Sequence, residues 1–124
     1  MLSSDTQTVT EYLRTYRHLG HTVLELHGEI DIAAVLEIRP HLAAATAAPR
    51  PLIVIDLTPA VFFDCAGVGL LCCARQRIHD RGGTLVLVCP HQFTLRILRA
   101  VRLYRVFHPV PTLGEALAEP PACG

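Results

Sequence analysis

Residues 52–89 read LIVIDLTPAVFFDCAGVGLLCCARQRIHDRGGTLVLVC, and this stretch decides the fold class. It opens and closes with apolar runs, 52–57 and 84–89, which are typical of central parallel strands covered on both faces. Between the runs, 64–81 carries a stripe of apolar side chains at helical spacing, formed by Leu70, Leu71, Ala74 and Ile78. A glycine pair at 82–83 then ends the helix with a left-handed cap. A strand, a helix and a second strand in this order predict an α/β fold with parallel strands.

The residues before this stretch predict a hairpin followed by a helix. The runs 9–17 and 22–27 flank a glycine-containing turn, and the second run alternates polar and apolar side chains, so both read as antiparallel strands. Asp31 is a good N-cap for the helix over 32–48, because its carboxylate can accept hydrogen bonds from free backbone amides. Pro40 lies inside that helix and predicts a kink or a late start.

The residues after the central stretch predict three short elements. A basic amphipathic segment spans 92–100, a short edge strand 104–108, and a last helix 112–118, where Thr112 and Glu115 form a capping box. The whole chain therefore predicts a central mixed, mostly parallel sheet of four to five strands with an N-terminal hairpin and about four α-helices.

Length, charge and cysteine content exclude several classes of protein. The chain has 124 residues, a length typical of a single domain. We expect this domain to span 8–118, with an N-terminal tail at 1–7 and a C-terminal tail at 119–124. Its 11 arginines balance its 11 acidic residues, so no overall charge draws it to nucleic acid or to an anionic membrane. We expect no membrane insertion and no secretion, since neither a long apolar run nor a signal segment is visible. Five cysteines without a disulfide framework favour the reducing cytoplasm.

Two motifs together carry a family resemblance. Gly-Glu-Ile-Asp at 28–31 is followed some thirty residues later by Asp-Cys-Ala-Gly-Val-Gly at 64–69, with the apolar strand 52–57 between them. Beyond them come the glycine pair at 82–83 and Glu-Ala-Leu at 115–117. In order and spacing these pieces resemble STAS domains, and among them the anti-sigma factor antagonists of bacterial partner switching. The resemblance covers about residues 8–118 and implies the STAS fold.

The resemblance also implies a function in transcription regulation. A protein of this kind binds a kinase-like ATPase that acts as an anti-sigma factor, and this binding releases a sigma factor. It implies stoichiometric protein–protein binding without catalysis, cofactor or metal, by a monomer or weak homodimer. The expected partner-binding residues lie on the two motifs and the second helix: Asp31, Asp64, Cys65, Ala66, Gly67, Val68, Gly69 and Gln76.

Cys65 departs from the family at the position of the serine that the anti-sigma kinase phosphorylates. Ala66 offers no hydroxyl instead, the only serines are Ser3 and Ser4, and Thr58 is a poor substitute. We therefore expect that ordinary serine phosphorylation does not switch this protein. Three interpretations stay open: a permanently competent antagonist, a small side chain tolerated after phosphorylation was lost, or a redox switch in which the helix start favours a reactive thiolate.

The remaining cysteines and histidines predict no metal site and no hydrolase site. Adjacent Cys72 and Cys73 point about 100° apart on a helix and are expected to be buried, and Cys89 is expected in the core. The seven histidines are scattered, and no third group or oxyanion hole completes a pair with Cys65. We expect most of these histidines to be solvated.

Two further hypotheses remain. Four arginines recur every third residue, and they read as a solvated face, a partner patch or an acidic-lipid contact: Arg96, Arg99, Arg102 and Arg105. Family members often have glycine or a small residue where Arg102 stands. The alternative function is a non-switching STAS scaffold or ligand-sensing subunit of a stressosome-like or transporter-associated complex.

Overall fold

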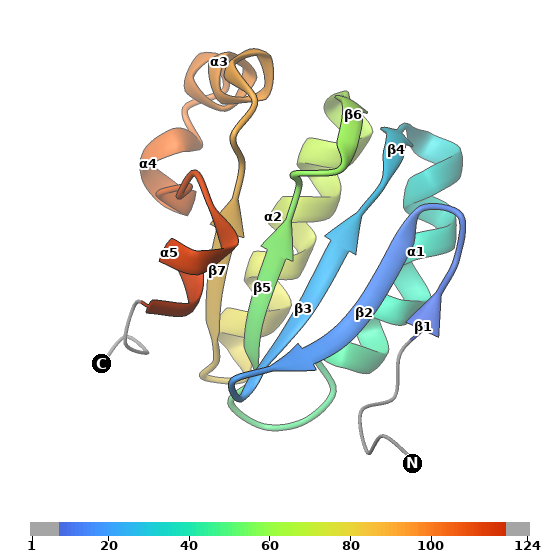
Figure 1. The fold of residues 1–124 in the computed structure, drawn as a ribbon, viewed down its shortest axis with the longest axis vertical. Helices are drawn as coiled ribbons and strands as arrows, with labels where there is room; N and C mark the ends of the chain where they lie inside the picture. The colour runs from blue at the N-terminus through green and yellow to red at the C-terminus, as the bar shows by residue number, and fades with distance from the viewer. Residues whose placement is uncertain (1–7, 119–124) are drawn as a thin grey trace.

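Five strands form the main sheet of the protein (Figure 1). The computed structural model describes residues 8–118, so the predicted tails 1–7 and 119–124 lie outside the described residues. The strands are β1 (Thr8–Val9), β2 (Leu13–His18), β3 (His21–Leu26), β5 (Leu52–Asp56) and β7 (Thr84–Val88), in the spatial order β1-β2-β3-β5-β7. Strand β2 pairs antiparallel with β1 and with β3, whereas β3, β5 and β7 pair in parallel with one another. The predicted mixed sheet and N-terminal hairpin are confirmed.

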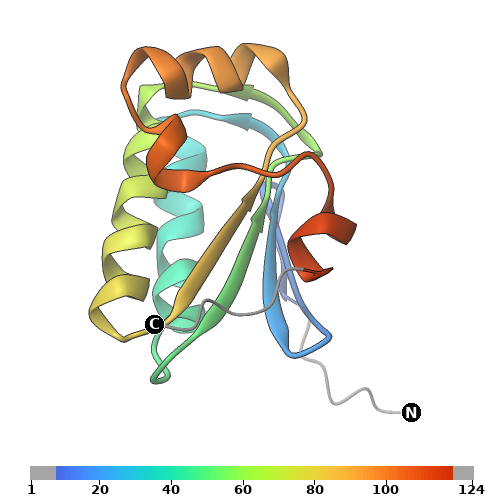
Figure 2. The same ribbon diagram turned by 90° about the vertical axis from the view of Figure 1, so that its left-hand side faces the viewer.

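Helices cover the two faces of this sheet unequally. Figure 2 shows α1 (Ile32–Ala45) and α2 (Cys65–Asp80) on one face and the short α5 (Leu113–Ala118) on the other. The larger core lies under α1 and α2, and it buries the predicted stripe of Leu70, Leu71, Ala74 and Ile78. A smaller cluster lies under α5 and consists of Val23, Val54, Val88 and Ala116. The described residues therefore contain two unequal cores separated by the central strands.

A second sheet of two strands was not predicted. Here β4 (Gly28–Ile30) pairs in parallel with β6 (Ala60–Phe63), beyond the ends of β3 and β5 (Figure 1). Residues 60–63 do not alternate between buried and exposed side chains as a half-buried strand does, because the consecutive residues Val61 and Phe62 are both exposed. The pairing joins segments about thirty residues apart, so the local pattern does not show it.

The two helices between β7 and α5 correct one prediction. They are α3 (Gln92–Ala100) and α4 (Tyr104–Phe107), so 104–108 is not an edge strand. The backbone of Phe107 bonds back to Leu103 at 3.0 Å, and its ring is buried. The edge of the sheet is instead extended by Val110, which bridges Val88 in parallel. The described chain has five helices where about four were expected.

The ends of α1 and α2 follow the predicted caps. Helix α1 begins at Ile32 and continues through Pro40, so the late start is wrong, because Asp31 caps the helix from its first turn. At the end of α2, Gly82 has a φ of 69° and the amide of Gly83 bonds to the carbonyl of Ile78 at 2.9 Å. This is the predicted left-handed glycine cap.

Candidate functional site

The small sheet brings the two predicted carboxylates together. In the parallel pair β4–β6, Ile30 lies opposite Phe63, so the residues that follow them, Asp31 and Asp64, occupy neighbouring positions. Both have extended backbones and both act as N-caps, Asp31 for α1 and Asp64 for α2. The starts of the two large helices therefore lie side by side, at the carboxyl ends of two parallel strands, where α/β proteins commonly bind ligands.

Each carboxylate accepts hydrogen bonds from the first turn of its own helix. Oδ1 of Asp31 accepts from the amide of Ala34 at 3.0 Å. Oδ1 of Asp64 accepts from the amides of Ala66 at 2.9 Å and Gly67 at 3.3 Å. Caps of this kind contribute about 1 kcal/mol each, so both aspartates have a structural function whether or not they contact a partner.

Cys65 is the first residue of α2 and its side chain is exposed. One exposed face of the helix continues from it through Gly69, Cys72 and Gln76. Gln76 donates a hydrogen bond from Nε2 to Oδ1 of Asp80 at 2.9 Å. Several of the predicted binding positions thus share one side of α2.

Cys72 and Cys73 are exposed, so the prediction that they are buried is wrong. The apolar stripe of α2 occupies its inner face, and two consecutive residues between Leu71 and Ala74 then turn outward. Cys89 is buried at the end of β7, as predicted. Within residues 8–118, no three His, Cys, Asp or Glu side chains lie close enough to hold a metal ion.

Gly67 and Val68 lie differently from the exposed positions around them. Gly67 is buried, and a Cβ atom there would come within 2.8 Å of the Phe63 ring. Val68 is partly buried against the main core. Gly69 has open space around its α-carbon. Packing accounts for Gly67, whereas packing within the chain gives no reason for a glycine at 69.

Apolar side chains surround the two helix starts, and sequence analysis missed them. The side chains of Ile32, Leu36, Val61 and Phe62 are 62%, 63%, 81% and 45% exposed, respectively. A groove of about 240 Å³ runs between α1 and α2 beside them, lined by Ile32, Val35, Arg39, Ala66, Gly69, Leu70 and Cys73. Clustered exposed apolar side chains mark interaction surfaces. The apolar run Val-Phe-Phe at 61–63, directly before the second motif, is the sequence feature that could have indicated this exposed apolar region.

Negative charge gathers next to this apolar region, around Tyr12. The pKa of the Tyr12 hydroxyl is raised above its ordinary 10.0, and the nearby carboxylate of Glu11 is the largest cause. Partial burial adds to the rise, and so do three further carboxylates: Asp31, Glu37 and Glu29. Three of these acidic residues belong to β4, to α1 or to the cap between them. A partner that covers the helix starts therefore meets a negative field on this side.

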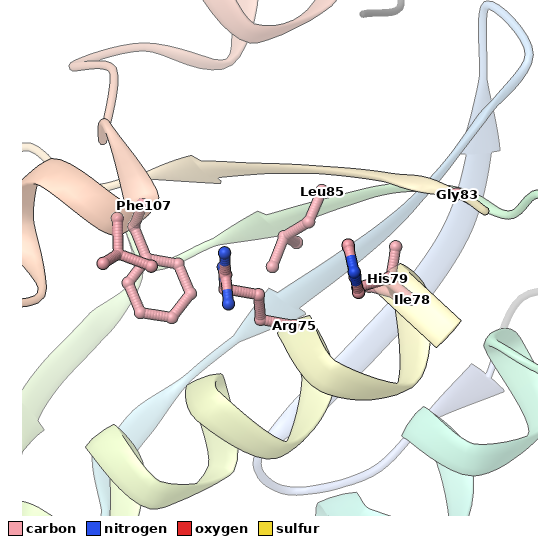
Figure 3. A pocket seen from close by; sticks show the side chains of 7 residues that line it. Arg75, Ile78, His79, Gly83, Leu85 and Phe107 are labelled. Carbon is pink, nitrogen blue, oxygen red and sulfur yellow. The ribbon is translucent and has the colours of Figure 1, made fainter. Parts of the chain in front are cut away.

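The far end of α2 holds a different hollow, of about 140 Å³, against α4 and β7 (Figure 3). Arg75 and His79 lie over apolar side chains there, among them Leu85 and Phe107. It is separate from the helix starts and contains none of the predicted site residues.

Three of the histidines bond within the fold. His91 contacts the carbonyl oxygens of Leu57 at 3.1 Å and Thr58 at 3.0 Å through Nε2, and His27 contacts Glu25 at 2.8 Å. His21 is buried, with Nδ1 at 3.2 Å from the carbonyl of Leu19, so it is not a solvated histidine.

Comparisons with known proteins agree on one family. A family model described as STAS domain matches residues 12–116. The anti-sigma-F factor antagonist RsfA of Mycobacterium tuberculosis is 32% identical over 104 residues, which cover 82% of this chain and 80% of that protein. Osmosensory protein A of the same organism is 38% identical over 76 residues, 61% of this chain, and the match spans only 48% of its length.

A solved structure agrees with these sequence matches. The crystal structure of an anti-sigma factor antagonist from Mycobacterium paratuberculosis superposes with a TM-score of 0.70 and 26% identity, covering 92% of both chains. Within residues 8–118, no helix combines the length and the apolar character needed to cross a bilayer.

Proposed function

This chain belongs to the STAS domain family, and we propose that it acts as an anti-sigma factor antagonist that binds a kinase-type anti-sigma factor and thereby releases a sigma factor. Its match to an antagonist relative extends over 80% of that relative's length. We place its action in the cytoplasm and assign it stoichiometric binding without catalysis.

One observation carries the proposal: an exposed apolar region is built around two neighbouring helix starts. We call it the cap surface and define it by Asp31, Ile32, Leu36, Val61, Phe62, Asp64 and Cys65. Interfaces bury aromatic and aliphatic anchors at their centre within a polar rim. Phe62 and Ile32 supply such anchors, and the carboxylates around Tyr12 supply a charged rim. The surface therefore suits a partner with an apolar patch bordered by basic side chains.

Cys65 lies on the cap surface, and the family resemblance places it where antagonists carry the serine that the kinase phosphorylates. A phosphate there would add up to two negative charges and three oxygen acceptors beside the partner. A thiol gives the kinase no hydroxyl to phosphorylate, and Cys65 is small enough to leave a close-fitting interface intact. We infer that the protein stays competent to bind and is controlled by its abundance or by another partner.

Binding to a kinase-type anti-sigma factor from the same genome tests the proposal. In the absence of ATP, wild type and Cys65→Ser should bind with similar affinity and release the sigma factor. Cys65→Asp should bind about tenfold or more weakly, because it places a charge in the interface. Ala118→Asp, which adds the same charge at an exposed position of α5 on the other face of the sheet, is the matched control and should bind like wild type. Equal binding by all four proteins would show that position 65 lies outside the interface.

Phosphorylation separates the switch from the binding. With the kinase and labelled ATP, wild type should take up no label within residues 55–70, and Cys65→Ser should gain it. Stoichiometric label on Thr58 of the wild type would overturn the claim that phosphorylation does not switch the protein.

Light scattering should report a monomer or weak homodimer, and a large assembly would favour a scaffold subunit instead.

A further inference from the structure

Three arginines meet at the junction of α3 and α4. Arg99 is an exposed residue in the last turn of α3, Arg102 lies in the turn between α3 and α4, and Arg105 is on α4. Together with Tyr104 they line a hollow of about 460 Å³. Arg96, the fourth member of the arginine row, does not line it. The junction lies beside β7, on the side of the sheet away from β4 and α1 (Figure 1).

Within residues 8–118, no acidic residue forms an ion pair with this cluster. Residues 81–114 contain no Asp or Glu. Within the described residues the ion pairs both involve Glu25, and none involves an arginine of α3 or α4. The negative end of the α3 dipole favours one cation near its last turn, which accounts for Arg99 alone. Arg102 and Arg105 therefore bring positive charges together without a paired acidic side chain among the described residues.

Arg99 is held in place by stacking. Its guanidinium carbon lies 4.3 Å from the centre of the Tyr104 ring. Stacking engages the flat face of the guanidinium and leaves its N–H donors free at the edge. The side chain is thus oriented before any ligand arrives, which lowers the entropy that binding would lose.

Arg102 occupies a backbone position that glycine would fill with less strain. Its φ is 64°, its amide bonds to the carbonyl of Arg99 at 3.1 Å, and the amide of Leu103 bonds to the carbonyl of Leu98 at 2.8 Å. This bonding pattern closes a helix with a left-handed residue, which is usually glycine. The backbone does not favour arginine here, and the arginine adds a third positive charge to the hollow.

We propose that Arg99, Arg102 and Arg105 bind the phosphate group of a phosphate monoester. The dianion presents three terminal oxygens to three guanidiniums, each with donors in a fork that matches phosphate. A compact cluster suits one such group, whereas an extended polyanion would also engage Arg96. The hollow is larger than a phosphate ion and leaves room for the organic part of the ester, which is either a soluble metabolite or a lipid headgroup.

Titrations at constant ionic strength, followed by amide chemical shifts, test the site with glycerol 3-phosphate and with vesicles containing phosphatidic acid. Saturable binding is expected for at least one of the two probes. Arg99→Gln, Arg102→Gln and Arg105→Gln should each weaken it about tenfold, since each loses charged hydrogen bonds. Arg96→Gln, the matched control of equal charge change, should weaken it less than about twofold.

Arg102→Gly distinguishes binding from folding. Glycine relieves the strain at a φ of 64°, so the melting temperature should stay level or rise while phosphate binding falls about tenfold. Binding of both probes shows recognition of the phosphate itself, binding of vesicles alone identifies a lipid headgroup, and binding of glycerol 3-phosphate alone identifies a soluble ester. The proposal is overturned if neither probe saturates, or if Arg96→Gln weakens binding as much as Arg102→Gln does.

Discussion

Gly67 and Gly69, two residues apart in α2, face opposite environments. A Cβ at 67 would meet the Phe63 ring at 2.8 Å, and Phe63 is itself only 1% exposed, so the ring has little room to move. A Cβ at 69 would meet nothing within 4 Å. The first glycine is needed for packing, and the second leaves open a part of the helix surface next to Cys65.

The two alanine substitutions should therefore shift stability in opposite directions. Gly69→Ala should raise the free energy of unfolding by up to about 1 kcal/mol, the helix-propensity difference. Gly67→Ala should lower it by about 1 kcal/mol, because overpacking outweighs the same gain. Urea denaturation measures both values. If both substitutions stabilise the protein, the contact with Phe63 does not constrain position 67.

Cys89 should make the protein less stable at alkaline pH. Burial raises the pKa of its thiol above the ordinary 9.0, and a hydrogen bond to the His91 backbone opposes part of this rise. The unfolded chain therefore loses this proton at lower pH than the folded chain does, and the free energy of unfolding falls as pH rises above about 9.

Urea denaturation at about pH 8 and about pH 10 measures this fall. Burial, followed by Glu25 and Asp56, also raises the pKa of Tyr16, and Glu11 above all raises the pKa of Tyr12, so part of the fall belongs to these two residues. Cys89→Val isolates the thiol and should show a smaller fall than wild type. Identical pH dependence in the two proteins would contradict the assignment to Cys89.

At the scale of the elements, α1 keeps a proline in its interior. Pro40 lacks the amide that would bond to the carbonyl of Leu36, and its ring crowds that carbonyl. The helix continues because its inner face, including Ile38 and Leu42, is buried in the main core. Tertiary packing here outweighs a local preference of about 3 kcal/mol.

Pro40→Ala should raise the free energy of unfolding by about 2 kcal/mol. The gain is smaller than the full propensity difference, because alanine also makes the unfolded chain more flexible. Thermal and urea unfolding of the two proteins give the value. A destabilised Pro40→Ala variant would mean that the proline shapes α1 in a way the core requires.

Helix α4 and strand β6 show where element prediction from sequence stops. Residues 104–108 are too few for their sequence pattern to distinguish a strand from a helix. In the structure the chain forms a helical turn there after α3, and the side chain of Phe107 is buried. Residues 60–63 form a strand only because β4 is present to pair with them. Helix α2 was predicted because its apolar stripe repeats over several turns, and β5 was predicted because its apolar run is short and rich in β-branched residues.

At the scale of the whole molecule, the sheet depends on α5 to cover its second face. Ala116 is fully buried against Val23, Val54 and Val88, and Ala118 on the same helix is exposed. Ala116→Asp should lower the free energy of unfolding by about 3 kcal/mol, because it buries a charged group without a partner. Ala118→Asp should change it by less than about 0.5 kcal/mol. Similar losses in both variants would mean that α5 does not form this core.

The sequence by itself determined the N-terminal hairpin, the parallel strands β5 and β7, the helices α1 and α2 with their caps at Asp31 and Asp64, the left-handed end of α2 and the absence of a serine at position 65. These features depend on residues within about one or two helical turns, where periodicity and hydrogen-bonding chemistry are decisive. They were enough to identify the family.

Only the tertiary structure decided which surfaces the family fold presents in this chain. It placed Asp31 beside Asp64 through the pairing of β4 with β6, exposed Phe62 and Ile32 around them, and turned Cys72 and Cys73 outward. It also gathered Arg99, Arg102 and Arg105 around one hollow and excluded Arg96. Such placements depend on how distant segments pack against one another, and no local pattern contains that information.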